Sequence, residues 1–194
     1  MPKKLLITRD NYMMSGIHIG TKQVTSQMKK FIYHIRKDGL VIFDLNKVDE
    51  RIRIAAKFLA EKKNILVVAR KNVAHKAVKK FGEIVNAKVV VGRYLPGMLT
   101  NPFLDEFFEA DVLLVTDPLS DRQAIEDALR ARIPIVAICD TSNETKNVDL
   151  IIPGNNKGRR AIATLYWLLA REILKERKEI KQDKDFAYKP EDFI

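Results

Sequence analysis

The segment Ile65-Leu66-Val67-Val68-Ala69 consists of five consecutive apolar residues with no polar residue between them. A strand with one face in water alternates apolar and polar residues, so an unbroken run of this length predicts a strand buried on both faces. Four more short apolar runs follow, at Val89–Val91, Val112–Thr116, Ile135–Cys139 and Leu150–Ile152. Strands of this kind are typical of a parallel sheet covered by helices.

Helical patterns lie between several of these runs. Apolar residues recur at helical spacing behind Asn72, a good N-cap, and Ser120 with Gln123 resembles a capping box that opens another helix. A long helix is predicted after the turn Pro153-Gly154-Asn155-Asn156. This alternation predicts an α/β fold, a five-stranded parallel sheet with helices on both faces.

The N-terminal third departs from that rhythm. Phe31–Ile35 and Leu40–Phe43 flank a polar segment with the step Asp38-Gly39, which favours a type I′ turn and therefore a β-hairpin. Asn46 then opens a helix. We expect an N-terminal extension with a β-hairpin over residues 1–45, an α/β core domain over 46–178 and a charged C-terminal tail over 179–194. The outer part of the tail is expected to be mobile or to dock on a partner.

Composition indicates a globular protein. The chain has 194 residues, enough for one domain with a full core, and 46% of them are hydrophobic. No apolar run approaches the ~20 residues of a membrane span. The run that begins at Leu5 is too short for a signal peptide, so we expect a cytoplasmic protein. The single Cys139 lies in an apolar run and fits a reduced thiol in a core strand.

Charge is unevenly distributed along the chain. The net charge is +10, yet residues 62–93 hold nine Lys/Arg against Glu83 alone, while residues 94–149 hold four against eleven acids. A basic face on a protein of this class most often meets a polyanion such as nucleic acid. The alternative is a solvated, charge-rich surface, which does not explain why the signs separate.

Two aspartates follow predicted strands. Asp117 and Asp140 would lie at the carboxyl ends of neighbouring strands, where two carboxylates could hold Mg²⁺ in an enzyme that acts on a phosphorylated small molecule. The same residues are ordinary turn formers, in Asp117-Pro118 and in Asp140-Thr141-Ser142-Asn143. We favour turns, because no third ligand and no phosphate loop accompany them.

The start of the last predicted helix offers a second candidate. Lys157, Arg159 and Arg160 surround a helix N-terminus whose free N–H groups could bind a phosphate, although a capped helix with solvated arginines fits equally well. The histidines His18, His34 and His75 lack the spacing of metal ligands, and no serine lies in a nucleophile elbow. We therefore expect no enzyme activity, no cofactor, no metal and no small-molecule substrate.

Four segments in a fixed order carry a family resemblance. The first is Gly16-Ile17-His18-Ile19-Gly20, which leads to Met28-Lys29-Lys30-Phe31-Ile32 and the hairpin. The others are Arg93-Tyr94-Leu95-Pro96-Gly97-Met98-Leu99-Thr100-Asn101, then 134–141 and finally 148–155. In this order and spacing the chain resembles the family of small-ribosomal-subunit protein two, over most of residues 8–175. Bacterial members insert a helical hairpin after the Met-Leu-Thr-Asn motif. Here residues 102–104 lead almost at once to Asp111, so the resemblance is to the archaeal type.

The resemblance implies a flavodoxin-like sheet and a place on the solvent side of the small ribosomal subunit. It also implies that the chain contacts ribosomal RNA and neighbouring ribosomal proteins and supports subunit assembly and translation. We expect the acidic stretch 94–149 to meet basic neighbouring proteins. The sequence does not identify the RNA helices, the neighbouring proteins or any role away from the ribosome.

Charge clustering and expected positions in loops or at helix starts select the candidate phosphate contacts. They are Lys22, Lys29, Lys30, Arg36, Lys37, Arg70, Lys71, Lys76, Arg93, Lys157, Arg159 and Arg160. The loop 92–102 carries apolar residues between turn formers, so it should be a packing or recognition element. We expect Tyr94 and Met98 to pack against the chain's own N-terminal extension rather than against a neighbour.

Overall fold

A computed structural model describes residues 5–194. Residues 1–4, which precede the short apolar run discussed above, lie outside the described part. Five parallel strands form the central sheet in the order β4-β3-β5-β6-β7. Their bounds are β3 Ile65–Ala69, β4 Lys88–Val91, β5 Val112–Val115, β6 Ile135–Cys139 and β7 Leu150–Pro153. This is the flavodoxin-like order, so the predicted five-stranded parallel sheet is confirmed.

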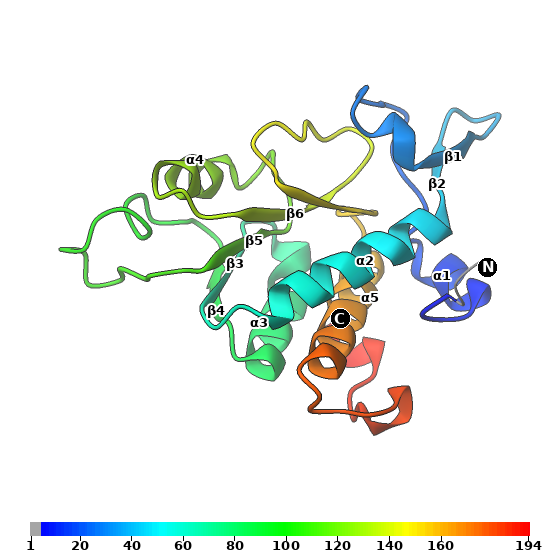
Figure 1. Cartoon of the computed structure of the whole chain (residues 1–194). Coiled ribbons are helices and arrows are strands. Elements are labelled where there is room, and N and C mark those ends of the chain that lie inside the picture. Colours follow the sequence, from blue (N-terminus) through cyan, green and yellow to red (C-terminus); the bar gives the residue numbers. More distant parts are fainter. Residues whose placement is uncertain (1–4) are drawn as a thin grey trace.

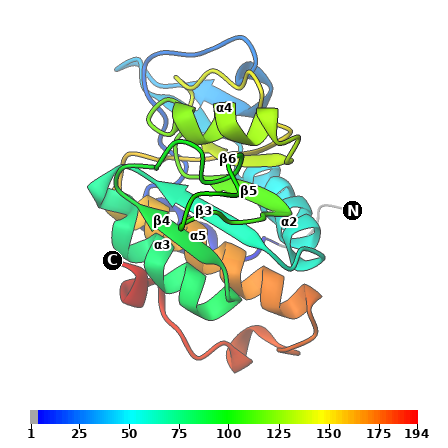
Figure 2. The same cartoon turned by 90° about the vertical axis from the view of Figure 1, so that its left-hand side faces the viewer.

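Helices cover both faces of this sheet, as predicted (Figures 1 and 2). The helices α2 (Leu45–Ala60), α3 (Asn72–Val85) and α5 (Arg159–Glu176) pack together on one face. The helix α4 (Arg122–Arg130) lies on the other. The connections from β4 to β5 and from β6 to β7 are loops without an α-helix, so the alternation of strand and helix is less regular than the pattern suggests.

Burial of the strands agrees with the sequence except at one edge. Every residue of β3, β5 and β6 is buried. In β4 Lys88 is exposed and the three valines are only half-buried. The prediction that Val89–Val91 is buried on both faces is therefore wrong. The reason is topological, because β4 pairs only with β3 and closes the sheet on that side.

Helix starts differ from the predicted caps. Asp44, rather than Asn46, caps α2 and accepts a hydrogen bond from Asn46 N at 3.0 Å. Asn72 is the first residue of α3, not its cap. The capping box predicted at Ser120 is absent, since the cap of α4 is Asp121. Ser120 Oγ instead donates to Asp117 Oδ2 at 2.7 Å, because that buried carboxylate competes for the hydroxyl.

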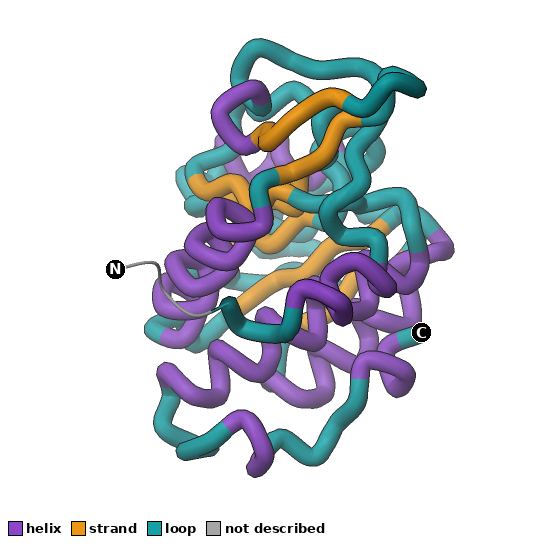
Figure 3. The backbone as a smooth tube through the Cα atoms, turned by 90° about the vertical axis from the view of Figure 1, so that its right-hand side faces the viewer, coloured by secondary structure: helices purple, strands orange, loops and turns teal. Residues whose placement is uncertain are grey.

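The N-terminal extension contains a hairpin that stands apart from the main sheet (Figure 3). Its strands β1 (Ile32–Ile35) and β2 (Val41–Phe43) are antiparallel, as predicted. The predicted type I′ turn is wrong, since it needs positive φ at two successive residues. In this turn only Gly39 has a positive φ, of 83°, and its N–H donates a hydrogen bond to Arg36 O at 2.9 Å.

A short helix precedes the hairpin and was not predicted. The helix α1 (Arg9–Ser15) begins after Thr8, whose hydroxyl accepts from Asn11 N. Its Tyr12 is fully buried, and the phenol donates to Asp49 Oδ1 of α2 at 2.6 Å. The sequence hides this helix because seven residues carry too little periodicity to recognise. The extension is thus anchored to the core by a buried polar contact.

The C-terminal segment folds back on the helical layer. It contains two 3₁₀ turns, η2 (Asp183–Asp185) and η3 (Pro190–Phe193), and η3 lies against α3 and α5. Phe193 is 1% exposed, and Trp167 Nε1 donates to Tyr188 O at 2.8 Å. The described tail thus docks on its own chain. The division of the chain at residues 45 and 178 stays a prediction. Within residues 5–194, no helix has both the length and the apolar character that a bilayer crossing requires.

Candidate nucleic-acid interface

Basic and polar residues gather where the parallel strands end, at what we call the carboxyl edge of the sheet. Arg70 directly follows β3 and Arg93 follows β4 after one glycine. Both arginines line one hollow of about 280 Å³. The helix α5 begins at the same edge with Arg159. The fold therefore brings together basic residues that lie far apart in the sequence, because carboxyl ends of parallel strands share one edge.

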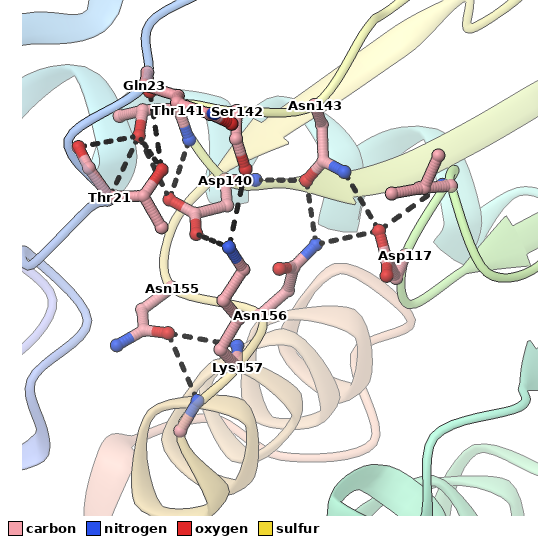
Figure 4. A network of polar contacts seen from close by, with 12 residues as sticks. Thr21, Gln23, Asp117, Asp140, Thr141, Ser142, Asn143, Asn155, Asn156 and Lys157 are labelled. Carbon is pink, nitrogen blue, oxygen red and sulfur yellow. Dashed lines mark hydrogen bonds and ion pairs between the residues drawn. The ribbon is translucent and has the colours of Figure 1, made fainter.

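The N-terminal extension is docked onto this edge. Thr21 N donates to Thr141 Oγ1 at 2.9 Å, and Thr25 Oγ1 donates to Asn143 O at 3.0 Å. Figure 4 shows Thr21 beside Thr141. On the other side Asn155 N donates to Ile17 O at 3.1 Å. The extension thus lies across the loops that follow β6 and β7, next to the basic residues of the core.

The candidate phosphate contacts fall into two groups. Five belong to the extension: Lys22, Lys29, Lys30, Arg36 and Lys37. Seven follow strands or lie on α3 and α5: Arg70, Lys71, Lys76, Arg93, Lys157, Arg159 and Arg160. All of them except Lys71 are exposed. Lys22 lies near the hairpin turn, since its methylenes stand 3.7 Å from the position of a Cβ on Gly39.

Lys71 is half-buried and forms an ion pair within the protein. Its ammonium lies 2.5 Å from Asp117 Oδ2, and the Asp117 side chain is only 3% exposed. Burial opposes the charged carboxylate, but hydrogen bonds from Lys71, Ser120 and Asn143 outweigh it and hold the pKa of Asp117 below its ordinary value. Lys71 is therefore engaged in holding the fold together.

Buried amide and carboxylate side chains fill the carboxyl edge (Figure 4). Asn143 Oδ1 accepts from Asp140 N at 2.7 Å and from Asn156 Nδ2 at 2.9 Å. Asn143 Nδ2 donates to Asp117 Oδ1 at 2.8 Å. Asn156 is fully buried, and its Nδ2 also lies 3.1 Å from Ile138 O, whereas its Oδ1 has no hydrogen-bond partner among residues 5–194. With that one exception, these side chains are satisfied by the protein's own groups.

Turn hydrogen bonds are present at both Asp117 and Asp140. Leu119 N donates to Asp117 Oδ1 at 3.3 Å, and Asn143 N donates to Asp140 O at 3.1 Å, so the turn interpretation is confirmed for both. Lys157 Nζ stands 3.6 Å from Asp140 Oδ2, so each carboxylate has a lysine partner. Within the described chain, no three His, Cys, Asp or Glu side chains gather in a way that could hold a metal ion.

The start of α5 shows the capping and the exposed arginines of one interpretation, and the phosphate contact stays a prediction. Asn155 Oδ1 accepts from Lys157 N at 2.9 Å and from Gly158 N at 3.1 Å, so a side chain does bind the N–H groups just before the helix. Gly158 itself, the N-cap, supplies no side chain. Among residues 5–194, no carboxylate lies within ion-pair distance of the exposed Arg159 or Arg160. Their charges are directed to solvent, and they remain candidate phosphate contacts.

The loop 92–102 packs on α4. Tyr94, Met98 and Leu99 are buried, and Gly97 N donates to Asp127 Oδ2 at 2.8 Å. Burial and the neighbouring Asp127 carboxylate raise the pKa of Tyr94. Packing within the chain is thus confirmed, but packing against the N-terminal extension is wrong. The loop and the extension lie at opposite ends of the molecule (Figure 1).

Other residues singled out from the sequence have structural roles. His75 Nε2 lies 3.2 Å from Arg70 O and ties α3 to the end of β3. Cys139 is fully buried in β6, where burial raises the pKa of its thiol, so the core thiol is confirmed. Sequence reasoning missed Thr141, Asn143 and Asn155 as the residues that join extension and core. The only signal in the sequence was that polar residues follow a buried strand. The same pattern is common in ordinary turns, so it did not identify these contacts.

The acidic stretch 94–149 is less acidic at the surface than its composition suggests. Four of its carboxylates are buried, those of Asp117, Asp121, Asp127 and Asp140. The exposed acids include Asp105, Glu106 and Glu109 in the loop before β5. Glu144 and Asp149 are exposed as well, in the connection between β6 and β7.

Comparisons with known proteins cover the segments that carry the resemblance. The family model described as "Ribosomal protein S2" matches residues 12–104 and 108–176. The small ribosomal subunit protein uS2 of Ignicoccus hospitalis is 54% identical over 183 residues, which cover 93% of this chain and 86% of that protein. The uS2 protein of Picrophilus torridus is 50% identical over 195 residues, covering 100% and 98%. The chain belongs to the ribosomal protein S2 family and is of the archaeal type.

Proposed function

We propose that this protein is a non-catalytic structural constituent of the small ribosomal subunit in the cytoplasm. It binds small-subunit ribosomal RNA and neighbouring ribosomal proteins, and so supports subunit assembly and translation. The proposal rests on family membership together with one observation. Exposed basic side chains of the extension and Lys157 of the carboxyl edge lie on adjoining surfaces, although they come from separate parts of the chain.

The surface chemistry suits a phosphate backbone. Arg and Lys contacts to phosphate position a protein on RNA without reading its sequence, and the folded shape of the RNA supplies specificity. The buried network beneath the carboxyl edge joins the loops after β5, β6 and β7, and the last of these carries Lys157. For binding through phosphate contacts, the logarithm of the affinity for RNA should fall linearly with the logarithm of the salt concentration.

The decisive experiment is cosedimentation of the protein with small subunits depleted of it, over a series of salt concentrations. In the double variant Arg159→Gln/Arg160→Gln, the salt slope should fall by about one for each phosphate that the protein no longer binds. Lys76→Gln should act in the same direction. The matched control is Lys88→Gln, an exposed lysine at the opposite end of β4 from Arg93.

Lys71→Gln separates folding from binding. Because Lys71 pairs with the buried Asp117, its loss should lower the free energy of unfolding and leave the salt slope nearly unchanged. Retention of the protein on subunits at a strength independent of salt would contradict phosphate recognition. Equal effects of Lys88→Gln and of the arginine variants would contradict the assignment to the carboxyl edge.

A further inference from the structure

One groove of the extension is not explained by phosphate contacts. It has a volume of about 630 Å³ and lies between α1, the hairpin and the start of α2. Residues from all three elements line it, among them Arg9, His18, Tyr33, Arg36 and Asn46. Arg36 aside, none of these was selected from the sequence as a site residue. The groove adjoins the basic surface but differs from it in having aromatic and amide walls.

The aromatic wall is unusually exposed. Tyr33 is 73% exposed although it stands on a strand, and its ring meets the His34 ring edge to face at a centroid distance of 5.2 Å. Holding an aromatic ring in water forgoes the free energy of burying it, which a partner can recover by stacking. His34 limits the freedom of the Tyr33 ring, so the stacking platform is partly ordered before anything binds.

Charged and hydrogen-bonding groups complete the groove. Arg9 and Arg36 line it from α1 and from the end of the hairpin strand, and the carboxylates of Asp10 and Asp44 line it as well. His18 is 9% exposed, and burial together with Arg36 lowers its pKa, so the imidazole is neutral. The carbonyl of Tyr12 can only accept, so His18 Nδ1 donates to it at 3.3 Å and Nε2 remains an acceptor. Asn46 adds an exposed amide with donors and an acceptor.

We propose that this groove binds an unpaired nucleotide of ribosomal RNA, with the base stacked on Tyr33 and the flanking phosphates near Arg9 and Arg36. This inference rests on the proposed function and specifies the form of RNA that the extension recognises. A base within a helix offers no free face for stacking, whereas a nucleotide of a loop or bulge does. Arg9 and Arg36, beside the aromatic face, can contact the phosphates that flank the stacked base.

The first test compares single-stranded and duplex RNA binding by the full-length protein. The probes are a labelled unstructured oligoribonucleotide of roughly ten nucleotides and a duplex of equal length, read by fluorescence anisotropy. Tyr33→Ala should weaken single-strand binding about tenfold and leave duplex binding unchanged, the usual effect of removing one stacked base. Tyr33→Phe should retain the affinity because the π-face remains. Phe103→Ala is the matched control, since Phe103 is 95% exposed in the acidic loop.

The second test uses assembled subunits. A photoreactive phenylalanine analogue at position 33 should crosslink to a nucleotide in a loop or bulge of the RNA. A crosslink to a ribosomal protein would overturn the inference and assign the groove to a protein neighbour. Unchanged single-strand affinity of Tyr33→Ala, in a protein that still cosediments with subunits in a salt-dependent way, would overturn the nucleotide groove alone. Loss of cosedimentation by the unmodified protein would overturn the proposed function itself.

Discussion

Asn143 Nδ2 donates a hydrogen bond of 2.8 Å to Asp117 Oδ1, which joins the loop after β6 to the end of β5. The two residues are 26 positions apart in the sequence and are 5% and 2% exposed. The backbone carbonyl of Asn143 also accepts from Thr25 of the extension. One amide side chain and its backbone therefore link the carboxyl edge of the core to the N-terminal extension.

Asn143→Ala should destabilise the fold. The variant removes a donor from the buried Asp117 carboxylate and an acceptor from the buried Asp140 N–H, so we expect a loss of about 2–4 kcal/mol in the free energy of unfolding. Urea denaturation measures it. The neighbouring Glu144 is exposed, and Glu144→Ala should change stability by less than about 0.5 kcal/mol. Equal stability of the two variants would show that the network contributes nothing.

Gly20→Ala should loosen the contact between extension and core. A Cβ on Gly20 would lie 2.5 Å from Thr141 Cγ2 and 3.0 Å from Thr141 Oγ1, so the threonine would have to move. We expect a cost of about 1–3 kcal/mol in thermal or urea unfolding. Thr141→Ser removes the methyl group and keeps the hydroxyl that binds Thr21 N, so the double variant should recover part of the loss.

Gly158→Ala serves as the control for that experiment. A Cβ there would meet its nearest atom, Asn155 Nδ2, at 3.4 Å, which is ordinary contact. It should therefore cost less than Gly20→Ala. If Gly20→Ala and Gly158→Ala proved equally costly, or if Thr141→Ser gave no recovery, close packing at Thr141 would not be the cause.

The sheet was predictable because its central strands are buried on both faces. The predicted ranges Ile65–Ala69 and Ile135–Cys139 match β3 and β6 residue for residue. The helix caps were less predictable, because several polar side chains compete for each backbone N–H. A side chain that could cap a helix can also bind another group that the tertiary fold brings near. Ser120 is an example, because its hydroxyl donates to the Asp117 carboxylate.

The candidate interface was predictable only in part. Charge clustering selected basic residues that prove to be exposed, but it also selected Lys71, whose partner Asp117 lies 46 positions away. Tertiary ion pairs of that separation leave no local pattern. The attachment of the extension was hidden for the same reason. Thr21 and Thr141 are joined at a sequence distance of 120, and neither residue is unusual in its own neighbourhood.

Asp121 should make stability depend on pH. Burial raises its pKa to about 6, while the unfolded chain releases the same proton near the ordinary value of about 3.9. Between about pH 4 and pH 6 the folded state therefore binds more protons than the unfolded state, and this contribution to stability falls as pH rises. Near pH 7 the loss amounts to about 2–3 kcal/mol relative to pH 4.

Asp121→Asn tests this linkage. The amide oxygen can still accept from Arg70 N, but the side chain no longer titrates. The stability of the variant relative to the parent should increase between pH 4 and pH 7, as measured by urea denaturation across that range. Asp111→Asn is the control, because hydrogen bonds from Asn64 N and Lys63 N lower the pKa of Asp111 and reverse the sign of its contribution. A flat difference for Asp121→Asn would place its pKa near the ordinary value.

Charge reversal in the loop before β5 should separate protein neighbours from RNA. Glu106 and Glu109 are exposed, so Glu106→Lys/Glu109→Lys should leave the fold intact. We expect weaker incorporation into small subunits, because these acids would otherwise face basic proteins, and undiminished affinity for naked ribosomal RNA. Binding of the free RNA and cosedimentation with depleted subunits measure the two effects separately.

Asp127 cannot serve in this experiment, although it belongs to the same acidic stretch. Its side chain is 2% exposed and holds Gly97 N at 2.8 Å, so reversing its charge would disrupt the loop 92–102. Glu126 is half-buried and paired with Arg122 at 2.8 Å. Charge reversal at Glu126 therefore serves as a control that should disturb the fold less than reversal at Asp127. The affinity of the double variant for naked RNA could instead fall together with its incorporation into subunits. The acidic loop would then belong to the RNA-binding surface, and its assignment to protein neighbours would be wrong.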